Sequence, residues 1–210
     1  MDKTKVILDY LDELYSTAEC SLNFSSPYEL LIAVMLSAQC TDKRVNIVTK
    51  ELFKLAKTPE EMLSLGEKKV KEIIHPCGFY NAKSKAIIET SKDLINKFNG
   101  KVPSTMEELT SLRGVGRKTA NVVIANAFGG QTIAVDTHVH RVSKRLALAK
   151  PNSTPYECES ELVKIVPCNR RTKFHHQMIL FGRNKCKAIN PNCEGCKLKN
   201  FCIEPKNSKK

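Results

Sequence analysis

The chain has 210 residues, enough for one sizeable core or two small ones. Its formal net charge of +12, from 34 Lys and Arg against 22 Asp and Glu, suits phosphate backbones, although an acidic membrane surface or plain solubility would explain it equally well. No stretch has the length of a membrane span or the order of a signal peptide, so we expect an unexported, cytoplasmic chain.

Apolar residues at helical spacing predict that most of the first hundred residues are helical. The second helix begins at the capping box Ser26-Pro27-Tyr28-Glu29 and ends near Gln39, and Gly66 marks a break between two later helices. No segment has the pattern of a strand. The expected helices span residues 3–15, 27–39, 42–55, 59–65, 68–75 and a long segment that ends at Asn99-Gly100.

Two glycine turns are each followed by a basic residue that opens a helix. The first is Gly78-Phe79-Tyr80-Asn81-Ala82-Lys83, in which the aromatic residues could simply belong to the core. The second lies in a helical hairpin over residues 105–128, where Gly114 and Gly116 flank Val115. Such glycines are expected where the backbone has positive φ or comes close to a ligand.

Lys118 falls in the first turn of the second hairpin helix, whose apolar residues recur at helical spacing up to Phe128. The positive end of a helix dipole disfavours an ammonium, so a lysine placed there is easier to use as a free amine. Asp136 precedes a helix over residues 137–148, and we interpret it as the N-cap, held anionic by that helix. Taken alone, Lys118 would more commonly be an ordinary exposed lysine, and Asp136 an ordinary N-cap.

The remaining pattern adds a helix over residues 155–166 and one around Phe174 and Phe181. About ten helices and no credible strand predict an all-α fold. The helix over 155–166 is expected to bury Tyr156 and Ile165 among its apolar residues.

Four cysteines near the end of the chain have the spacing C-x6-C-x2-C-x5-C, in a segment with little apolar content. Structural zinc usually takes two close pairs, disulfides are rare inside cells, and the common ferredoxin patterns differ. The residues therefore predict a four-cysteine metal site without choosing the metal. The ligands are Cys186, Cys193, Cys196 and Cys202; the cysteines at 20, 40, 77, 158 and 168 are expected to be buried small hydrophobes.

The hairpin sequence Leu-Arg-Gly-Val-Gly-Arg-Lys-Thr-Ala-Asn-Val-Val followed by Val-Asp-Thr-His resembles the endonuclease III family of helix-hairpin-helix, Gly/Pro-Asp DNA glycosylases. Leu-Ser-Ala-Gln-Cys-Thr-Asp at 36–42 and Gly-Phe-Tyr-Asn-Ala-Lys at 78–83 extend the resemblance, which runs from about Pro27 to the last cysteine. It implies a bifunctional glycosylase and AP lyase of base excision repair, acting on double-stranded DNA with oxidised pyrimidines or abasic sites. We expect the chain to be a monomer.

In that family, the lysine that matches Lys118 is the nucleophile, and the aspartate that matches Asp136 assists it. The glutamine that matches Gln39 enters the space left by the departing base, and the loop of Phe79 wedges an apolar side chain into the opposite strand. The resemblance thus implies the following DNA-binding residues: Gln39, Gly78, Phe79, Arg113, Gly114, Val115, Gly116, Thr137 and His138.

The resemblance also implies two helical lobes with a DNA-binding cleft between them. Residues 20–131 would carry the hairpin, and residues 1–19 with 132–210 would form the second lobe, which places Lys118 and Asp136 on opposite walls. In this family the four cysteines hold a [4Fe-4S] cluster in the loop 186–202. Its plainest role is to pin a basic loop against DNA, and a redox role is open.

Two residues depart from the family pattern. Arg113 replaces the proline that usually opens the hairpin, which we expect to loosen the turn, and Gly130 stands where a larger residue is common. Both leave the lesion preference open. Two rival hypotheses remain: a monofunctional glycosylase of the same fold, and a non-enzymatic DNA-binding iron-sulfur module, which would give Lys118 and Asp136 no role.

Overall fold

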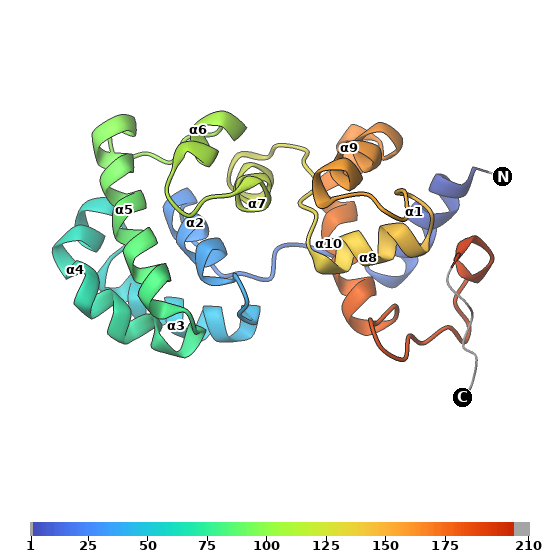
Figure 1. Ribbon diagram of the computed structural model, residues 1–210, viewed down its shortest axis with the longest axis horizontal. Coiled ribbons are helices and arrows are strands. Elements are labelled where there is room, and N and C mark those ends of the chain that lie inside the picture. Colours follow the sequence, from blue (N-terminus) through green and yellow to red (C-terminus); the bar gives the residue numbers. More distant parts are fainter. Residues whose placement is uncertain (1, 204–210) are drawn as a thin grey trace. The chain divides into compact units, whose positions relative to one another are not determined.

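The structure is a computed structural model that describes residues 2–203 (Figure 1). Within these residues there are ten α-helices, three short 3-10 helices and no β-strand, so the expected all-α fold is confirmed. The chain divides into two compact units, Cys20–Gly130 and Met1–Glu19 with Gln131–Lys210. The basic residues at 206–210 lie outside the described part of the chain.

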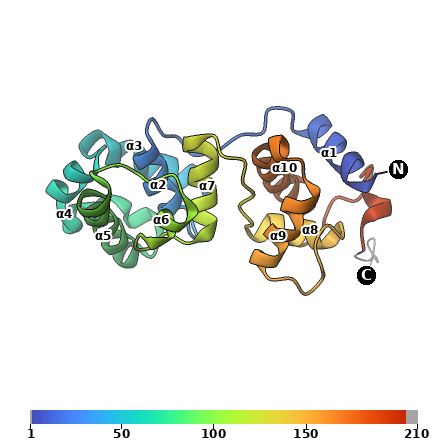
Figure 2. The ribbon, with the colours of Figure 1, turned by 90° about the horizontal axis from the view of Figure 1, so that it is seen from above.

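The unit Cys20–Gly130 is built around one helix that is buried on all sides. In α2 (Pro27–Leu36) every residue after the first is buried, as expected of a helix that is apolar all round. Figure 2 shows α2 surrounded by the other helices of this unit. They are α3 (Asp42–Leu55), α4 (Pro59–Ile74), α5 (Tyr80–Phe98), α6 (Met106–Ser111) and α7 (Arg117–Phe128).

Local sequence signals set most of the helix ends in this unit. Ser26 caps α2 as expected, whereas the first hairpin helix, α6, is capped by Thr105 and not by Ser104, the cap that the capping-box pattern Ser104-Thr105-Met106-Glu107 predicts. The helices expected over 59–65 and 68–75 together form α4, which is interrupted at Gly66 as expected, because φ of 77° and ψ of 154° there are not helical. Helix α2 ends at Leu36 rather than near Gln39, because Gln39 adopts a left-handed φ of 53° that a helix cannot continue through.

The second unit has a core of its own, formed by α1 (Lys3–Leu14), α8 (Thr137–Arg145), α9 (Pro155–Ile165) and α10 (Arg171–Asn184). Phe174 and Phe181 of α10 are among its largest fully buried side chains. Cys186 and Cys196 pack against this core, so the cysteine loop is attached to it. Helix α1, although far away in the sequence, supplies Ile7, Leu8, Tyr10 and Leu11 to the same core.

Several sequence expectations for this unit were wrong in detail. Tyr156 and Ile165 are 59% and 39% exposed, because α9 packs through the narrow face of Cys158, Glu159 and Leu162. The helix expected over 137–148 ends at Arg145. The single cysteines are not uniformly buried: Cys77 and Cys158 are, whereas Cys20 and Cys40 are half-buried and Cys168 is exposed. Across the described residues, no helix combines the length and hydropathy needed to cross a membrane.

Candidate active site and cysteine-lined pocket

The hairpin between α6 and α7 is a tight turn that only glycine can make at one position. The Val115 N–H donates to the Leu112 carbonyl at 3.2 Å, and both side chains are buried beneath the turn. Gly114 has φ of 74°, and a Cβ there would lie 3.0 Å from the Ala86 Cβ and 3.3 Å from the Met35 Cε. Conformation and space therefore both require glycine, as the sequence led us to expect.

Gly116 differs from Gly114. Its φ of −93° is open to any residue, and a Cβ there would meet nothing within 4 Å, so the expectation of positive φ fails at this position. It is exposed and is the N-cap of α7, with no side chain of its own to bond the first amides of the helix. What remains for Gly116 is the other reason to use glycine, the close approach of a ligand to bare N–H groups.

Arg113 does not leave the turn loose, contrary to our expectation. The Thr90 hydroxyl donates to the Arg113 carbonyl at 2.5 Å, which ties the hairpin to α5. The guanidinium Nε lies 3.4 Å from Glu89 Oε2, with the arginine side chain 68% exposed. Thr90 thus supports the turn where the usual proline is missing, and no sequence motif had indicated it.

Lys118 is the second residue of α7 and is exposed. Helix α7 is anchored from its first turn, since the Ala120 N–H donates to the Gly116 carbonyl at 3.0 Å and Ala120 is fully buried. The apolar stripe expected to reach Phe128 is shorter, because Phe128 is 39% exposed. The amine therefore stands at a rigid helix start beside the open backbone of Gly116.

Gln39 and Phe79 both lie in exposed turns of the same unit as the hairpin. Both have left-handed backbones, with φ of 53° and 49°, and Gly78 before Phe79 has φ of 68°. Phe79 is 64% exposed, so its assignment to the core is excluded. Tyr80 is the aromatic residue of this loop that packs, with its ring centroid 4.3 Å from that of His75.

Asp136 is the N-cap of α8, as expected. Its Oδ1 accepts a hydrogen bond from the Val139 N–H at 2.8 Å, and its carbonyl accepts from the His140 N–H at 2.9 Å. The preceding residues 133–135 are buried and hold the cap in place. The Asp136 carboxylate is half-buried at the positive end of the α8 dipole.

The two residues after Asp136 differ in exposure. Thr137 is exposed, whereas His138 is half-buried and its Nδ1 lies 3.4 Å from Arg141 Nη2. Burial lowers the pKa of His138, Asp136 opposes that shift, and Arg141 adds to it. His138 is thus favoured as a neutral imidazole. His140 is engaged elsewhere, with Nε2 2.7 Å from the Ser153 carbonyl.

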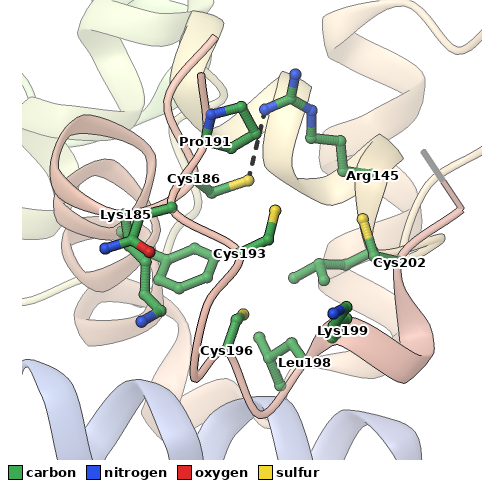
Figure 3. Close-up of a pocket in the computed structure, with 12 residues that line it drawn as sticks. Arg145, Lys185, Cys186, Pro191, Cys193, Cys196, Leu198, Lys199 and Cys202 are labelled. Carbon is green, nitrogen blue, oxygen red and sulfur yellow. Dashed lines mark hydrogen bonds between the residues drawn. The ribbon is translucent and has the colours of Figure 1, made fainter. Parts of the chain in front are cut away.

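All four cysteines of the C-terminal motif line one small cavity of about 50 Å³. Figure 3 shows their sulfur atoms around the same space. The loop is tied locally, for example by the Asn192 N–H to the Lys185 carbonyl at 2.9 Å, and to α1 by the Tyr10 hydroxyl, which donates to the Gly195 carbonyl at 3.4 Å. Backbone and core packing thus bring the four thiols together.

Arg145 supports this loop from α8. It is 8% exposed, and its Nη1 donates to the Cys186 Sγ at 3.6 Å and to the Lys187 carbonyl at 2.6 Å, while Nη2 donates to the Ala188 carbonyl at 3.2 Å. Burial raises the pKa of the Cys186 thiol, and the Arg145 contact opposes that rise. The sequence motif did not point to Arg145, because 41 residues separate it from Cys186.

The donor set of the cavity fits a thiolate-bound metal group. Its lining among the described residues contains four cysteines and neither histidine nor carboxylate. Within residues 2–203, however, no three such side chains come close enough together to hold a single metal ion.

The site residues are distributed over the two units. The unit Cys20–Gly130 carries Lys118 with Gln39, Gly78, Phe79 and the hairpin residues 113–116. The other unit carries Asp136, Thr137, His138 and the four cysteines.

Comparison with known proteins identifies the family. Residues 32–168 match the model of the HhH-GPD superfamily base excision DNA repair protein. Endonuclease III of Bacillus subtilis is 46% identical, over 94% of this chain and 90% of its own, and endonuclease III of Escherichia coli K12 is 47% identical, over 96% of each.

A solved structure of a trapped covalent intermediate of endonuclease III with DNA, an estranged-adenine complex, superimposes with a TM-score of 0.92 at 44% identity. It covers 97% of this chain and 96% of that one. The chain therefore belongs to the HhH-GPD superfamily of base excision DNA repair proteins and, within it, to the endonuclease III family.

Proposed function

We propose that this chain is a bifunctional DNA glycosylase and AP lyase that removes oxidised pyrimidines from double-stranded DNA, with Lys118 as the nucleophile. The observation that carries the proposal is an exposed amine at the start of α7, beside an open hairpin backbone, in a chain of the endonuclease III family. A member of that family has been trapped covalently on DNA, which requires a protein nucleophile.

The first step is recognition of the duplex and extrusion of the damaged nucleotide. The hairpin formed by Gly114, Val115 and Gly116 contacts phosphate through the amides of its two glycines and through Arg113. Phosphate contacts bind every sequence alike, which suits a search for lesions. Gln39 and Phe79 enter the stack from their exposed turns and hold the gap open, with Gly78 allowing the backbone to turn before Phe79. Thr137 and His138 contact the DNA from the other unit.

The second step is chemistry at the sugar. The Lys118 amine attacks C1′ as the bond from C1′ to the base breaks, and the departing base takes up a proton. Asp136, fixed as the N-cap of α8, stabilises the positive charge that develops on the sugar. Loss of a further proton from nitrogen and opening of the sugar ring give a Schiff base. A proton then leaves C2′, the 3′ phosphate departs by β-elimination, and water releases the enzyme.

We assign the four-cysteine cavity to a [4Fe-4S] cluster held by Cys186, Cys193, Cys196 and Cys202. The four cysteines that line the cavity, without histidine or carboxylate among the described lining residues, and the family membership support this assignment. When bound, the cluster supplies a rigid cross-link for a loop that has little apolar content. Lys187 is exposed in that loop, and with Lys185 it adds positive charge for DNA. Equal amounts of iron and inorganic sulfide in the purified protein are expected, whereas zinc would overturn the assignment.

In this proposal, the chain binds damaged duplex DNA as a monomer, in the compartment that holds the chromosome. Borohydride trapping on an oligonucleotide with an abasic site tests the chemistry. We expect a covalent adduct with the wild-type chain and none with Lys118→Ala. Lys118→Arg is the matched control, since it keeps the charge and the DNA affinity but has no free amine. A wild-type chain without an adduct, or an adduct that survives in Lys118→Ala, would overturn the proposal.

A further inference from the structure

A second lysine, Lys83, lies in the first turn and a half of α5 and is buried. It is 8% exposed, a rare environment for an ammonium group. Its Nζ donates to the Leu36 carbonyl at 2.9 Å and to the Cys77 carbonyl at 3.0 Å. Burial lowers the pKa of this lysine, and the nearby Cys77 and Cys40 thiols oppose that shift. A buried ammonium that donates to two backbone carbonyls links the two segments that carry them.

The two acceptors lie just before the two exposed turns of the proposed DNA interface. Leu36 is the last residue of α2 and comes three residues before Gln39, and Cys77 comes two residues before Phe79. The last carbonyls of a helix lack partners within it and attract a cation. One ammonium therefore links the end of α2 with the loop before α5, although 47 residues separate Lys83 from Leu36.

Both turns have a backbone that must be held in place. Gln39 and Phe79 are two of the five non-glycine residues with positive φ in the described chain, a strained conformation that persists only where the surroundings impose it. Arg44 adds a second, exposed tie, with its Nη1 3.3 Å from the Pro76 carbonyl. Lys83 and Arg44 thus both donate to carbonyls of the loop before Phe79, and Lys83 alone of the two also donates to the end of α2.

We propose that Lys83 is a positioning residue that sets the separation between the turns of Gln39 and Phe79, so that both side chains enter the duplex together. This inference rests on the proposed function of those two residues. Without the ammonium, the residues of each turn are unchanged, but the separation between the two turns is no longer fixed. Loss of the Lys83 ammonium therefore affects extrusion of the base and does not change the reactivity of the Lys118 amine.

An abasic site separates these two steps, because it has no base to unstack and its extrusion costs least. Lys83→Met keeps most of the apolar stem and removes the donors. We expect roughly tenfold slower single-turnover excision of thymine glycol, equivalent to about 1.4 kcal/mol, with trapping at a preformed abasic site within about twofold of wild type. Fluorescence of 2-aminopurine opposite the lesion, which rises on unstacking, should fall with the excision rate.

Lys85→Met is the matched control, since it removes an exposed lysine of the same helix and hence the same charge. We expect it to leave both rates within about twofold of wild type. In a protein that already carries Gln39→Ala and Phe79→Ala, adding Lys83→Met should not lower the excision rate further, because a positioning residue acts only through the groups it positions. A purely structural role would instead lower excision and trapping equally, and would persist in that background.

Thermal unfolding of each variant shows whether a lost rate reflects a lost fold. If Lys83→Met is too unstable to purify, Lys83→Gln, whose amide is too short to reach both carbonyls, should show the same selective loss of excision. Equal loss of both rates, or no difference from Lys85→Met, overturns the role of Lys83. A wild-type chain that forms no borohydride adduct would instead overturn the proposed function itself.

Discussion

The two glycine turns of this chain have the same local sequence plan and opposite outcomes. Each ends one helix, turns at a glycine and opens the next helix with a lysine, yet Lys118 is exposed whereas Lys83 is buried on two carbonyls. Lys118 is the second residue of its helix and Lys83 the fourth, and each residue turns a helix by about 100°. Two positions of difference are enough to turn one lysine toward solvent and the other toward the core.

This contrast shows how one residue type serves reaction and architecture within a single unit. An amine that is to attack a sugar must be reachable and free of fixed partners, whereas one that holds two loops must be desolvated and fully bonded. Exchanging those environments would abolish both roles. Five predictions test the roles of these two turns, in order of decreasing effect.

The largest effect is expected on the chemistry of Lys118. Lys118→Ala should lower the lyase rate at an abasic site by at least roughly a thousandfold, equivalent to about 4 kcal/mol of transition-state stabilisation. The measurement is strand cleavage under single-turnover conditions. Cleavage that falls less than tenfold would mean that another group forms the covalent bond.

The next effect concerns the two hairpin glycines. Gly114→Ala should lower the free energy of unfolding by about 2–4 kcal/mol, because φ is left-handed and the Ala86 and Met35 side chains leave no room. Gly116→Ala has space and an ordinary φ, so it should cost less than about 1 kcal/mol. Urea unfolding measures both.

Gly116→Ala should nevertheless weaken binding to abasic-site DNA by roughly tenfold, because a methyl group would hold phosphate away from the amides. Fluorescence anisotropy measures that affinity. Unchanged affinity would show that DNA does not approach the hairpin closely at Gly116.

The two lysines should also differ in what they contribute to stability. Lys83→Met leaves the Leu36 and Cys77 carbonyls without their donor and should cost about 1–3 kcal/mol. Lys118→Met, at an exposed position, should change the free energy of unfolding by less than about 0.5 kcal/mol. Equal changes in the free energy of unfolding for the two variants, measured by urea unfolding, would contradict the difference between the two environments.

The smallest effect is a pH dependence of stability carried by Lys83. Burial lowers its pKa below the ordinary 10.5, so the folded state releases this proton at lower pH than the unfolded state. The free energy of unfolding of wild type, relative to Lys83→Met, should therefore rise with pH in the window just below 10.5, by less than about 1 kcal/mol. Urea unfolding of both proteins at pH 8.5 and 10.5 measures this difference, and a fall with rising pH would contradict it.

Local signals were sufficient to predict the helical class and several of the site features. Caps such as Ser26 and Asp136, and the left-handed φ at Gly114, depend on neighbours within a few residues, so a short stretch of sequence is enough to predict them. Burial along a helix was predicted less well, as Phe128 and Tyr156 show, because periodicity indicates which residues could pack but not how far a partner helix extends.

The sequence by itself determined the all-α class, the capped helix starts, the glycine hairpin and the presence of four cysteines in one segment. Only the tertiary structure decided that Thr90 supports the hairpin, that Arg145 supports the cysteine loop, and that Lys83 is buried between two turns. Each of these ties joins residues more than twenty positions apart, and its strength comes from exclusion of water. Neither distance in space nor burial is a property of a short stretch of chain, so they appear only once the helices have packed.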